Sequence, residues 1–478
     1  MFFVFLNFIH FFYDMIQLIF QNGTILLKGI SELPEYLSSY CVYDERVEAW
    51  RAQANQYAPI VTCLYRRKVP YQDHARDYKE LDLYLNTDKK PRNYQQAGLQ
   101  AWKKSNYCGI IVLPTGSGKS FLAQLAMKMV SRSTLVVVPT LDLMAQWASQ
   151  LEKMFGQKIG LLGGGSHEIM PITVSTYDSA VLQMEFIGNR FGLLIVDECH
   201  HLPGAVNRQL ALECIAPFRL GLSATPERPD QGEDVLTELL GPICFRKEID
   251  ELEGKVLAPY ETEQVPIRLE EDEAVLYRKH HAYYRDFIRR NNISFGAANG
   301  WAKFIIACSQ LPDGSECMKS FLLQRKIARG SRAKLQKIWA LLQRHHEERI
   351  LIFTADNATA YDIGEKFCLP VLTHYTKILE RRQFLDAFRR GEYFCLVTSK
   401  ILNEGVDVPE AGIGIVVSGS GSVREHVQRL GRILRPMNGK RAHLYELVSI
   451  DTSECYVSEK RRHHRAYERS DTMSNPQS

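Results

Sequence analysis

A glycine-rich turn that carries a lysine follows an apolar run in the segment CGIIVLPTGSGKSFLAQLAMKMV, residues 108–130. This pattern predicts a strand, a loop and a helix in direct succession. In such a loop, Gly116 and Gly118 let backbone N–H groups curl around phosphate oxygens, and the helix N-terminus adds its dipole. Lys119 would reach the outer phosphates, and the Ser120 hydroxyl would bind Mg²⁺. The segment therefore predicts a site for a nucleoside triphosphate.

Two carboxylates end a second apolar run, in FGLLIVDECHHLPG. Asp197 and Glu198 would lie at the carboxyl end of a buried strand, where ligands bind in open α/β folds. Asp197 is the candidate for holding Mg²⁺ through water, and Glu198 is the candidate for deprotonating an attacking water. We expect this strand to lie beside the strand that leads into the phosphate loop. The loop departs from the strict phosphate-loop motif at Leu113, where glycine is typical. The prediction of a nucleotide site therefore rests on the loop and on the two carboxylates together.

Two further segments add hydroxyl and guanidinium groups. In LGLSATP, Ser223 and Thr225 follow a short apolar run and could report whether the nucleotide site is filled. In EHVQRLGRILRP, Gln428, Arg432 and Arg435 recur at about one helical turn. The arginines could form an ordinary salt-bridged face. They could also enter a nucleotide site from a second lobe, as arginine fingers do.

Taken together, the motifs occur in the order typical of superfamily 2 helicases, which the chain resembles over residues 92–436. Arg92, Tyr94 and Gln95 match the segment with which that superfamily reads the adenine base. The other matching segments are LPTGSGKS, PTLDLMAQW from Pro139, TVSTYDSA from Thr173, DECH, SAT, ILIFTADN from Ile350, TSKILNEGVDVP from Thr398, and QRLGRILR. The segments DECHHLPG and SGSGSVREHVQRLGRILRP are similar in sequence to those of the XPB-type DNA helicases. The resemblance implies an α/β fold with two RecA-like parallel-sheet lobes in tandem.

The resemblance also implies roles for individual residues, with ATP and Mg²⁺ as the cofactors. Residues expected to bind the nucleotide are Arg92, Gln95, Gly116, Ser117, Gly118, Lys119, Ser120, Gly405 and Asp407. Those expected to be catalytic are Lys119, Asp197, Glu198, Gln428, Arg432 and Arg435, with Ser120 and Asp197 at the metal. Those expected to contact the DNA backbone are Pro139, Thr140, Thr176, Arg228 and Thr398.

The implied activity is that of an ATP-dependent DNA helicase or translocase, of 3′–5′ polarity, acting on duplex or forked DNA in repair. One departure keeps an alternative open. The resembled family has an Arg-Glu-Asp triplet after SAT, whereas this chain has Arg228, Pro229 and Asp230. Proline removes the middle carboxylate and a backbone donor. The alternative is an ATP-switched DNA-binding or remodelling subunit that lacks processive unwinding and serves a nuclease or repair partner. An RNA helicase is disfavoured by Cys199 and His200.

Length and composition are those of an ordinary globular protein of more than one domain. The chain has 478 residues, of which 45% are hydrophobic and 24% charged, and its formal net charge is only +4. A nucleic-acid partner must therefore be argued from local basic surfaces. The 11 cysteines are scattered and favour neither a zinc site nor a disulfide framework. They predict a reducing cytoplasm, and the resemblance to archaeal and bacterial XPB-type helicases implies the prokaryotic cytosol or nucleoid.

The first twenty residues, MFFVFLNFIHFFYDMIQLIF, are apolar enough to suggest a membrane span. Asn7, His10 and Asp14 interrupt the run, and no lysine or arginine precedes Lys28. We therefore expect no membrane anchor, and we interpret residues 1–14 as an extension or a mis-assigned start. From Met15 onward the pattern predicts a strand, an Asn-Gly turn and a second strand.

The remaining chain divides by pattern into five parts. Residues 15–84 form a small N-terminal domain, in which YDERVEAWRAQANQY resembles the damage-recognition domain of XPB-type proteins through Asp44, Arg46, Arg51, Ala52 and Tyr57. A structural role for this segment is nearly as well supported as a DNA contact. Residues 85–258 and 333–455 alternate apolar runs with helical stretches and predict the two RecA-like lobes. A basic, polar tail follows at 456–478.

Between the lobes, residues 259–332 predict a helical insertion at the place where the resembled family has a thumb-like element. The insertion is strongly basic, and aromatic residues are interleaved with its charges: Tyr283, Tyr284, Phe287, Phe295 and Trp301. Such a surface is either a solvated face or a nucleic-acid contact. We expect Arg325, Lys326 and Arg329 to contact DNA phosphates, while the aromatic residues mostly pack the helices.

Overall fold

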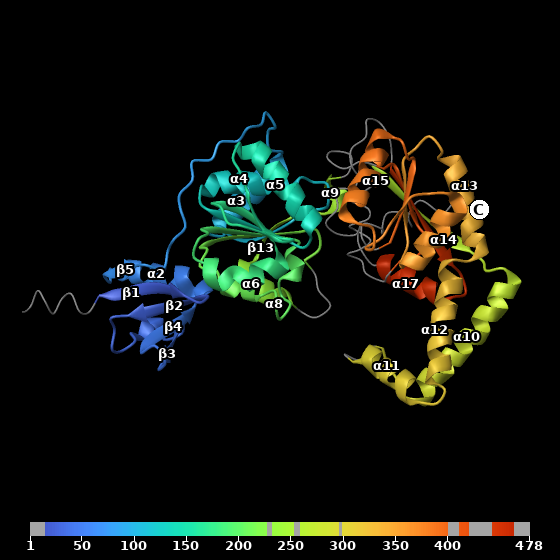
Figure 1. Ribbon diagram of the computed structural model, residues 1–478, viewed down its shortest axis with the longest axis horizontal. Helices are drawn as coiled ribbons and strands as arrows, with labels where there is room; N and C mark the ends of the chain where they lie inside the picture. The colour runs from blue at the N-terminus through green and yellow to red at the C-terminus, as the bar shows by residue number, and fades with distance from the viewer. Residues whose placement is uncertain are drawn as a thin grey trace, which may run out of the picture. The chain divides into compact units, whose positions relative to one another are not determined.

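The computed structural model describes residues 15–226, 232–252, 259–295, 299–399, 411–419 and 442–462 (Figure 1). The chain divides into two compact units, Met1–Glu251 and Leu252–Ser478. The expected extension 1–14 and most of the tail lie outside the described residues. Among the helices of the described ranges, none is long and apolar enough to cross a membrane.

The first unit begins with a five-stranded sheet of order β3-β4-β2-β1-β5. Its elements are β1 (Ile16–Gln21), β2 (Thr24–Lys28), η1 (Glu35–Leu37), β3 (Cys41–Asp44), β4 (Ala49–Gln53), η2 (Ala54–Gln56), α2 (Tyr57–Arg66) and β5 (Tyr71–Asp73). Asn22 and Gly23 join β1 to β2 with φ of 47° and 68°, as a two-residue hairpin turn requires. The predicted hairpin is therefore confirmed.

The same unit continues into an eight-stranded sheet of order β13-β6-β12-β11-β7-β10-β8-β9, which is parallel except for β9. Its strands are β6 (Cys108–Val112), β7 (Thr134–Val138), β8 (Gly160–Gly163), β9 (Ser166–Glu168), β10 (Ile172–Thr176), β11 (Leu193–Asp197), β12 (Phe218–Ser223) and β13 (Ile243–Arg246). Its helices are α3 (Asn93–Lys104), α4 (Lys119–Val130), α5 (Leu141–Phe155), α6 (Tyr177–Ile187), η3 (Cys199–His201), α7 (Gln209–Leu212), α8 (Glu233–Leu240) and α9 (Ile249–Leu252).

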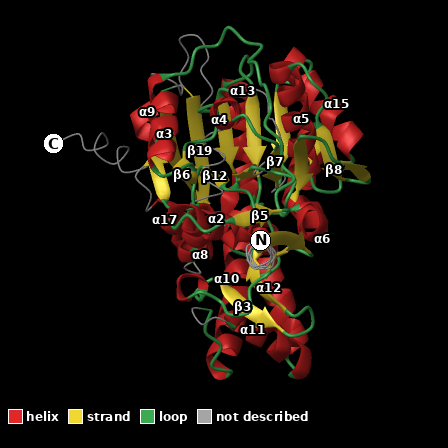
Figure 2. Cartoon of the chain, turned by 90° about the vertical axis from the view of Figure 1, so that its left-hand side faces the viewer, coloured by secondary structure: helices red, strands yellow, loops and turns green. Residues whose placement is uncertain are grey.

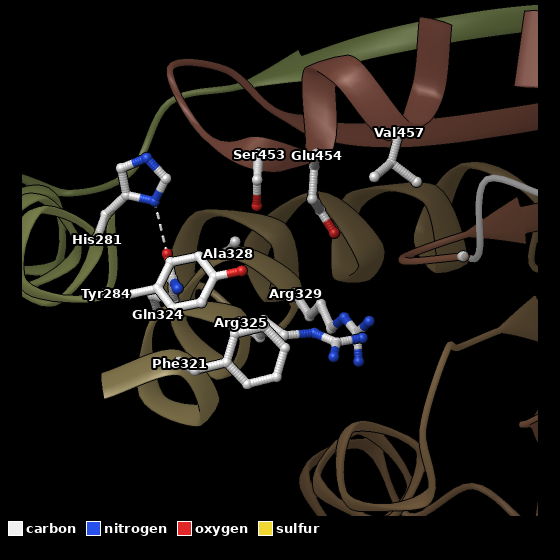
Figure 3. Close-up of a pocket in the computed structure, with 11 residues that line it drawn as sticks. His281, Tyr284, Phe321, Gln324, Arg325, Ala328, Arg329, Ser453, Glu454 and Val457 are labelled. Carbon is white, nitrogen blue, oxygen red and sulfur yellow. Dashed lines mark hydrogen bonds between the residues drawn. The ribbon is translucent and has the colours of Figure 1, made fainter. Parts of the chain in front are cut away.

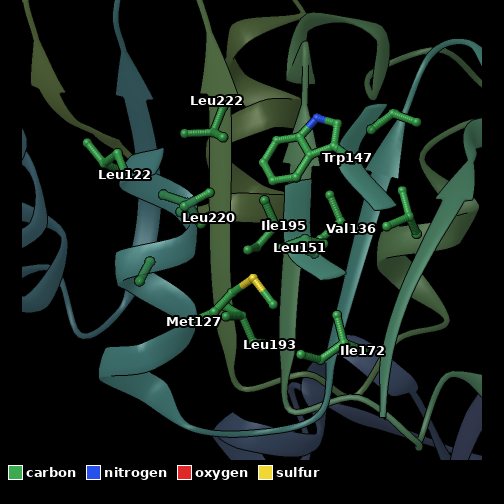
Figure 4. Packing of buried hydrophobic residues seen from close by; sticks show 14 of the residues in the cluster. Leu122, Met127, Val136, Trp147, Leu151, Ile172, Leu193, Ile195, Leu220 and Leu222 are labelled. Carbon is green, nitrogen blue, oxygen red and sulfur yellow. The ribbon is translucent and has the colours of Figure 1, made fainter. Parts of the chain in front are cut away.

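Helices cover both faces of this sheet, which explains why its inner strands β7, β10 and β11 are buried along their whole length. Leu193 and Ile195 face one core, where Trp147 and Met127 pack from α5 and α4 (Figure 4). Their neighbours in β11 face a second core, built with α6, α7 and α8. Side chains of successive strand residues therefore alternate between two buried layers.

The strand order corrects one prediction. We expected the strand before the phosphate loop, β6, to lie beside the strand that ends in Asp197, β11. β12 lies between them and pairs with both. The two strand ends still share one edge of the sheet, because all three strands run parallel.

The small N-terminal sheet is joined to the large sheet by specific contacts. The Gly23 amide donates to the Glu185 carbonyl at 3.0 Å, so the hairpin turn docks on α6. Ile215 is buried in the core of the small sheet although it belongs to the larger domain in sequence. These contacts explain why both sheets belong to one unit.

The second unit has a six-stranded parallel sheet of order β14-β19-β18-β15-β17-β16. Its strands are β14 (Tyr260–Ile267), β15 (Ile350–Phe353), β16 (Val371–Leu372), β17 (Cys395–Thr398), β18 (Ile413–Val416) and β19 (Ala442–Ser449). Its flanking helices are α13 (Arg332–Arg344), α14 (Asn357–Phe367), α15 (Ile378–Arg390) and α17 (Ser453–Arg462). The residues of β14, which we assigned to the helical insertion, pair with β19 along their whole length and so extend this sheet.

The insertion itself consists of α10 (Glu271–Arg290), α11 (Gly300–Gln310) and α12 (Gly314–Arg329). Figures 1 and 2 both show these helices projecting from the six-stranded sheet. Phe287, Phe304 and Cys317 form their small core, against which Tyr283, Tyr284 and Phe321 pack. Most of the aromatic residues therefore hold the helices together, as expected. Phe295 and Trp301 remain 44% and 51% exposed.

Candidate functional site

The predicted strand, loop and helix are present, with β6 ending at Val112 and α4 beginning at Lys119. Gly116 and Gly118 have φ of 83° and 86°, in the left-handed region that favours glycine. A Cβ on Gly118 would lie 2.8 Å from Nε2 of Gln95. The loop is therefore shaped by its glycines and closed from one side by Gln95.

Gln95 and Arg92, the residues expected to read the base, lie at the start of α3. The Gln95 side chain is buried, and its Nε2 donates to the Gly118 carbonyl at 3.2 Å while its Oε1 accepts from the Arg92 amide at 2.9 Å. The Tyr94 hydroxyl donates to the Ser117 carbonyl. The Ser117 hydroxyl donates to the Pro114 carbonyl at 2.7 Å. The start of α3 thus holds the loop, and base recognition by Arg92 and Gln95 stays a prediction.

The Asp197 carboxylate is held at the end of β11 by two donors. The indole Nε1 of Trp147 donates to its Oδ2 at 2.9 Å, and the amide of Glu198 donates to its Oδ1 at 3.0 Å. Asp197 is only 7% exposed. Burial raises the pKa of Asp197, and the neighbouring charge of Glu198 raises it further, while Lys119 opposes the shift. A cation at this carboxylate would offset the cost of its burial.

Lys119 and Glu198 bring the two segments together. The Lys119 ammonium lies 4.0 Å from Oε1 of Glu198 and donates to the Leu113 carbonyl at 3.3 Å. Both side chains are largely shielded from solvent, at 12% and 13% exposure. Glu198 has φ of 47°, an uncommon conformation for a non-glycine residue. The strained backbone directs the residue that follows Asp197 toward the phosphate loop.

His200 and Ser223 connect Glu198 to the end of β12. The His200 Nδ1 lies 3.4 Å from Oε2 of Glu198 and 3.3 Å from the Ser223 hydroxyl. That hydroxyl also accepts from the Thr225 amide at 3.1 Å. The Thr225 hydroxyl is buried and has no hydrogen-bond partner among the described residues. This chain of contacts gives Ser223 and Thr225 a physical route to the nucleotide site.

These residues fit a nucleotide with Mg²⁺. Ser120 is the second residue of α4 and partly exposed, so its hydroxyl and the Asp197 carboxylate supply the oxygen ligands that Mg²⁺ prefers. The Thr115 hydroxyl in the loop is buried without a partner in the described part of the chain, as a group reserved for a ligand would be. Within that same part, no cluster of three or more His, Cys, Asp or Glu could hold a metal by itself.

The expected DNA contacts of the first unit also lie at the carboxyl edge of the large sheet. Pro139 and Thr140 follow β7, and the Thr140 hydroxyl caps α5 by accepting from the Leu143 amide at 3.3 Å. Thr176 ends β10, and its hydroxyl accepts from the Ser179 amide at 3.4 Å to cap α6. Both positions present helix N-termini, which bind phosphate.

The expected DNA contacts of the second unit are less uniform. The Thr398 side chain is fully buried, and its hydroxyl donates to the Ser399 carbonyl at 3.1 Å. Arg329 is paired with Asp356 at 2.8 Å, and Arg325 is half-buried over the ring of Phe321. Only Lys326 is exposed as a free phosphate contact would be. The predictions for Gln428, Arg432, Arg435, Gly405, Asp407 and Arg228 fall outside the described residues.

Three family models match the chain. Residues 18–75 match the Xeroderma pigmentosum group B helicase damage recognition domain, residues 88–228 match the type III restriction enzyme res subunit, and residues 323–466 match the ERCC3/RAD25/XPB C-terminal helicase. The chain is 36% identical to the DNA 3′-5′ translocase XPB2 of Sulfurisphaera tokodaii, and the match covers 88% of this chain and 95% of that protein. The chain belongs to the XPB family of helicases.

Other XPB relatives are longer than this chain. It is 31% identical to a putative DNA 3′-5′ helicase Rad25 of Halobacterium salinarum, with 85% of this chain and 62% of that protein covered. It is 30% identical to the DNA 3′-5′ helicase XPB of Mycobacterium tuberculosis, with 78% of this chain and 63% of that protein covered. The chain therefore spans less than two thirds of the length of these two relatives.

Solved structures support the expected fold class. The yeast Dbp5 structure with RNA and ADP BeF3 matches with a TM-score of 0.55 at 15% identity, over 78% of this chain and 88% of that one. The Hef helicase domain of Pyrococcus furiosus matches with a TM-score of 0.50 at 19% identity, over 78% and 98%. Together with the two large parallel sheets, these matches confirm the predicted tandem RecA-like lobes.

In the segment that matches the XPB damage recognition domain, the residues that suggested the likeness have structural contacts. The Asp44 carboxylate accepts from Arg46 at 2.9 Å and from Arg51 at 2.7 Å, and the Tyr57 hydroxyl donates to Asp73 at 2.5 Å. These contacts favour the structural interpretation of the segment.

Sequence reasoning missed two aromatic residues that contact the acidic pair, Asp197 and Glu198. Trp147 bonds the Asp197 side chain, and the Tyr177 hydroxyl lies 3.0 Å from the Asp197 carbonyl oxygen and 3.2 Å from that of Glu198. Each of the two is a buried aromatic residue with a polar atom, which usually finds a hydrogen-bond partner. The sequence feature that could have identified them is an aromatic residue with a polar atom within each of the motifs PTLDLMAQW and TVSTYDSA.

Proposed function

We propose that this chain is an ATP-dependent 3′–5′ DNA translocase or helicase of the XPB type that acts in DNA repair. The observation that carries the proposal is the meeting of Lys119 and Glu198, 4.0 Å apart, at the strand ends that also hold Asp197. Relatives named as DNA 3′-5′ translocases and helicases support the polarity and the substrate.

The residues of the first unit divide the chemistry among them. Lys119 and the N–H groups of the glycine loop would bind the outer phosphates, and Ser120 and Asp197 would hold Mg²⁺, which would neutralise phosphate charge there. Glu198 accepts the proton of the attacking water. His200 contacts both Glu198 and Ser223, so a movement of Glu198 would also move Ser223. Gln428, Arg432 and Arg435 are proposed to complete the site from the second lobe.

DNA contacts are proposed at the sheet edge that carries the catalytic residues. The N-terminal ends of α5 and α6, at Thr140 and Thr176, would bind backbone phosphates without reading sequence. Duplex or forked DNA is the proposed partner. Two plant relatives and a yeast relative are named as subunits of the general transcription and DNA repair factor IIH, so a repair protein is a reasonable further partner.

Two matched variants test the chemistry. Glu198→Gln should bind ATP and DNA but hydrolyse poorly, whereas Lys119→Ala should also lose nucleotide affinity. ATP hydrolysis should be titrated with single-stranded DNA, duplex, forked duplex and RNA, beside a strand-displacement assay. Wild-type turnover in Glu198→Gln would remove that residue from the mechanism. Stimulation by RNA alone would contradict the DNA assignment.

The same assays address the alternative of a remodelling subunit that lacks processive unwinding. The names of the relatives do not favour this alternative. DNA-stimulated ATP hydrolysis without strand displacement would nevertheless support it, and would identify Pro229 as the residue to replace with glutamate.

A further inference from the structure

A cavity of about 230 Å³ lies in the second unit where α10 and α12 meet α17 (Figure 3). Its volume is sufficient for a small anion and several waters. Its lining comes from all three helices and includes Tyr284, Phe321, Arg325, Arg329, Ser453 and Glu454. None of them belongs to the nucleotide motifs.

Arg325 is the unusual member of this cavity. Its guanidinium is half-buried and lies 5.0 Å from the centre of the Phe321 ring. Across the described ranges, no carboxylate lies within ion-pair distance of it. Burial lowers the pKa of Arg325, and the positive charge of Arg329, one helical turn away, lowers it further, while the negative charge of Asp356 opposes the shift. A partly desolvated cation with a like-charged neighbour would gain from an anion.

The negative groups nearby are already committed. The Glu454 carboxylate accepts from Lys334 at 2.6 Å, and Asp356 binds Arg329 at 2.8 Å. The Asp356 carboxylate also caps α14 by accepting from the Thr359 amide at 2.9 Å. Among the described residues, Arg325 is therefore the cation of this cavity without an ion pair, because Asp356 is committed to Arg329.

Two hydroxyls add donors to the cavity. Burial raises the pKa of Tyr284 to about 12, against the opposing positive charges of Arg325 and Arg285, so the phenol stays protonated near neutral pH. Neither its hydroxyl nor that of Ser453 has a hydrogen-bond partner in the described part of the chain. Figure 3 shows both side chains and Arg325 directed toward the space between α12 and α17. Hydroxyls and a planar guanidinium are the donors that bind phosphate.

We propose that this cavity binds one phosphate group, with Arg325 as the anchoring cation and the Tyr284 and Ser453 hydroxyls as further donors. The inference rests on the proposed function, because nucleic-acid phosphates and the inorganic phosphate released from ATP are the two sources of this chemistry. A bound phosphate would bridge the projecting helices α10 and α12 to α17 of the lobe. Arg329, which is paired with Asp356, is not part of this binding group.

The test compares Arg325→Gln with Lys319→Gln in the full chain. Lys319 lies on the same helix, is 73% exposed, pairs with Glu316 and does not line the cavity, so its replacement removes the same charge elsewhere. Hydrogen–deuterium exchange of peptides from α12 and α17 is measured with inorganic phosphate in one arm and forked duplex in the other. Peptides of α4 report phosphate at the nucleotide loop and serve as an internal control.

We expect phosphate or DNA to slow exchange in α12 and α17 for the wild type and Lys319→Gln but not for Arg325→Gln. Protection by inorganic phosphate alone would assign the free anion as the source. Protection by DNA, with the slope of log affinity against log salt reduced by roughly 0.7 to 0.9 in Arg325→Gln, would assign the DNA backbone. Arg325→Lys should restore part of either effect, because it keeps the charge but not the fork.

The proposal is overturned if neither ligand gives protection that depends on Arg325 while the variant's unliganded exchange matches the wild type. Failure of the proposed function would look different. In that case the wild type itself would show no DNA-stimulated ATP hydrolysis.

Discussion

Lys334 and Glu454 form an ion pair inside the second unit, and its removal has a calculable effect. The Lys334 side chain is fully buried, and its Nζ donates to Oε2 of Glu454 and to the Val417 carbonyl, both at 2.6 Å. That carboxylate also accepts from the Ser449 amide at 3.2 Å. Lys334→Met keeps most of the apolar stem but leaves a buried carboxylate without its counter-charge and Val417 without this donor.

The magnitude follows from these losses. Breaking a buried pair by removing one partner costs about 3–5 kcal/mol, and an unpaired buried carbonyl alone costs about 1–3 kcal/mol. We therefore expect Lys334→Met to lower the free energy of unfolding of the second unit by about 3–5 kcal/mol. The double variant Lys334→Met/Glu454→Leu removes both charges, so its loss should come only from the unpaired Val417 carbonyl and Ser449 amide, about 1–3 kcal/mol each, and should fall below the sum of the two single losses.

The assay is the urea dependence of hydrogen–deuterium exchange in peptides of β18 and β19, which isolates this unit from the first. Lys337→Met is the control, because Lys337 lies on the same helix, is partly exposed, and should change stability by less than about 0.5 kcal/mol. A double variant that loses the sum of the two single losses would refute the coupling of the pair. A loss below about 1 kcal/mol for Lys334→Met would refute the buried-charge reasoning itself.

Four further predictions concern the first unit. Gly118→Ala should weaken ATP binding measured by fluorescence titration, because Gly118 has a φ of 86° and a Cβ there would lie 2.8 Å from Gln95. The control is Gly156→Ala, which should only destabilise the fold, because Gly156 has a φ of 64° and no neighbour within 4 Å of a Cβ. Trp147→Phe should cost about 1–3 kcal/mol in thermal unfolding and raise the Mg²⁺ concentration needed for hydrolysis; Trp102→Phe loses a similar buried bond to the Arg219 carbonyl and should leave that requirement unchanged. Tyr177→Phe should reduce the stimulation of ATP hydrolysis by DNA more than the basal rate, and equal losses in both would contradict a coupling role. A chain beginning at Met15 should retain ATP hydrolysis and DNA binding, and partition of the full chain but not of the shortened one into membranes would show that the N-terminal interpretation is wrong.

The features that sequence predicted well are those fixed by a few adjacent residues. The strand, loop and helix around Lys119 follow from an apolar run, two glycines and a helical pattern within one short segment. The Asn22–Gly23 hairpin follows from a turn that needs two residues with positive φ. In each case the local conformational preference and the final structure agree, so distant contacts did not need to be known.

The features that sequence did not predict depend on partners far along the chain. β12 lies between β6 and β11, and β14 pairs with β19, because sheet order is decided by packing of whole elements. Thr398, an expected DNA contact, is fully buried, and its hydroxyl donates to the carbonyl of the next residue, Ser399. Arg329, an expected phosphate contact, forms an ion pair with Asp356, the N-cap residue of α14. Hydrophobic periodicity indicates which residues are buried, but it does not indicate which residues they contact.

One contact missed by sequence connects the two proposed activities of the first unit. Tyr177 is the first residue of α6 and directly follows Thr176, a proposed phosphate contact. Its hydroxyl lies 3.0 Å from the Asp197 carbonyl oxygen and 3.2 Å from that of Glu198. A shift of the Glu198 backbone, which is held at a φ of 47°, therefore acts directly on the N-terminus of α6. Because Tyr177 is buried and its hydroxyl lies within hydrogen-bond distance of the Asp197 and Glu198 carbonyls, a DNA strand that binds at Thr176 and a nucleotide that binds at Lys119 would bias the same element. That shared element is the physical requirement for DNA-stimulated hydrolysis.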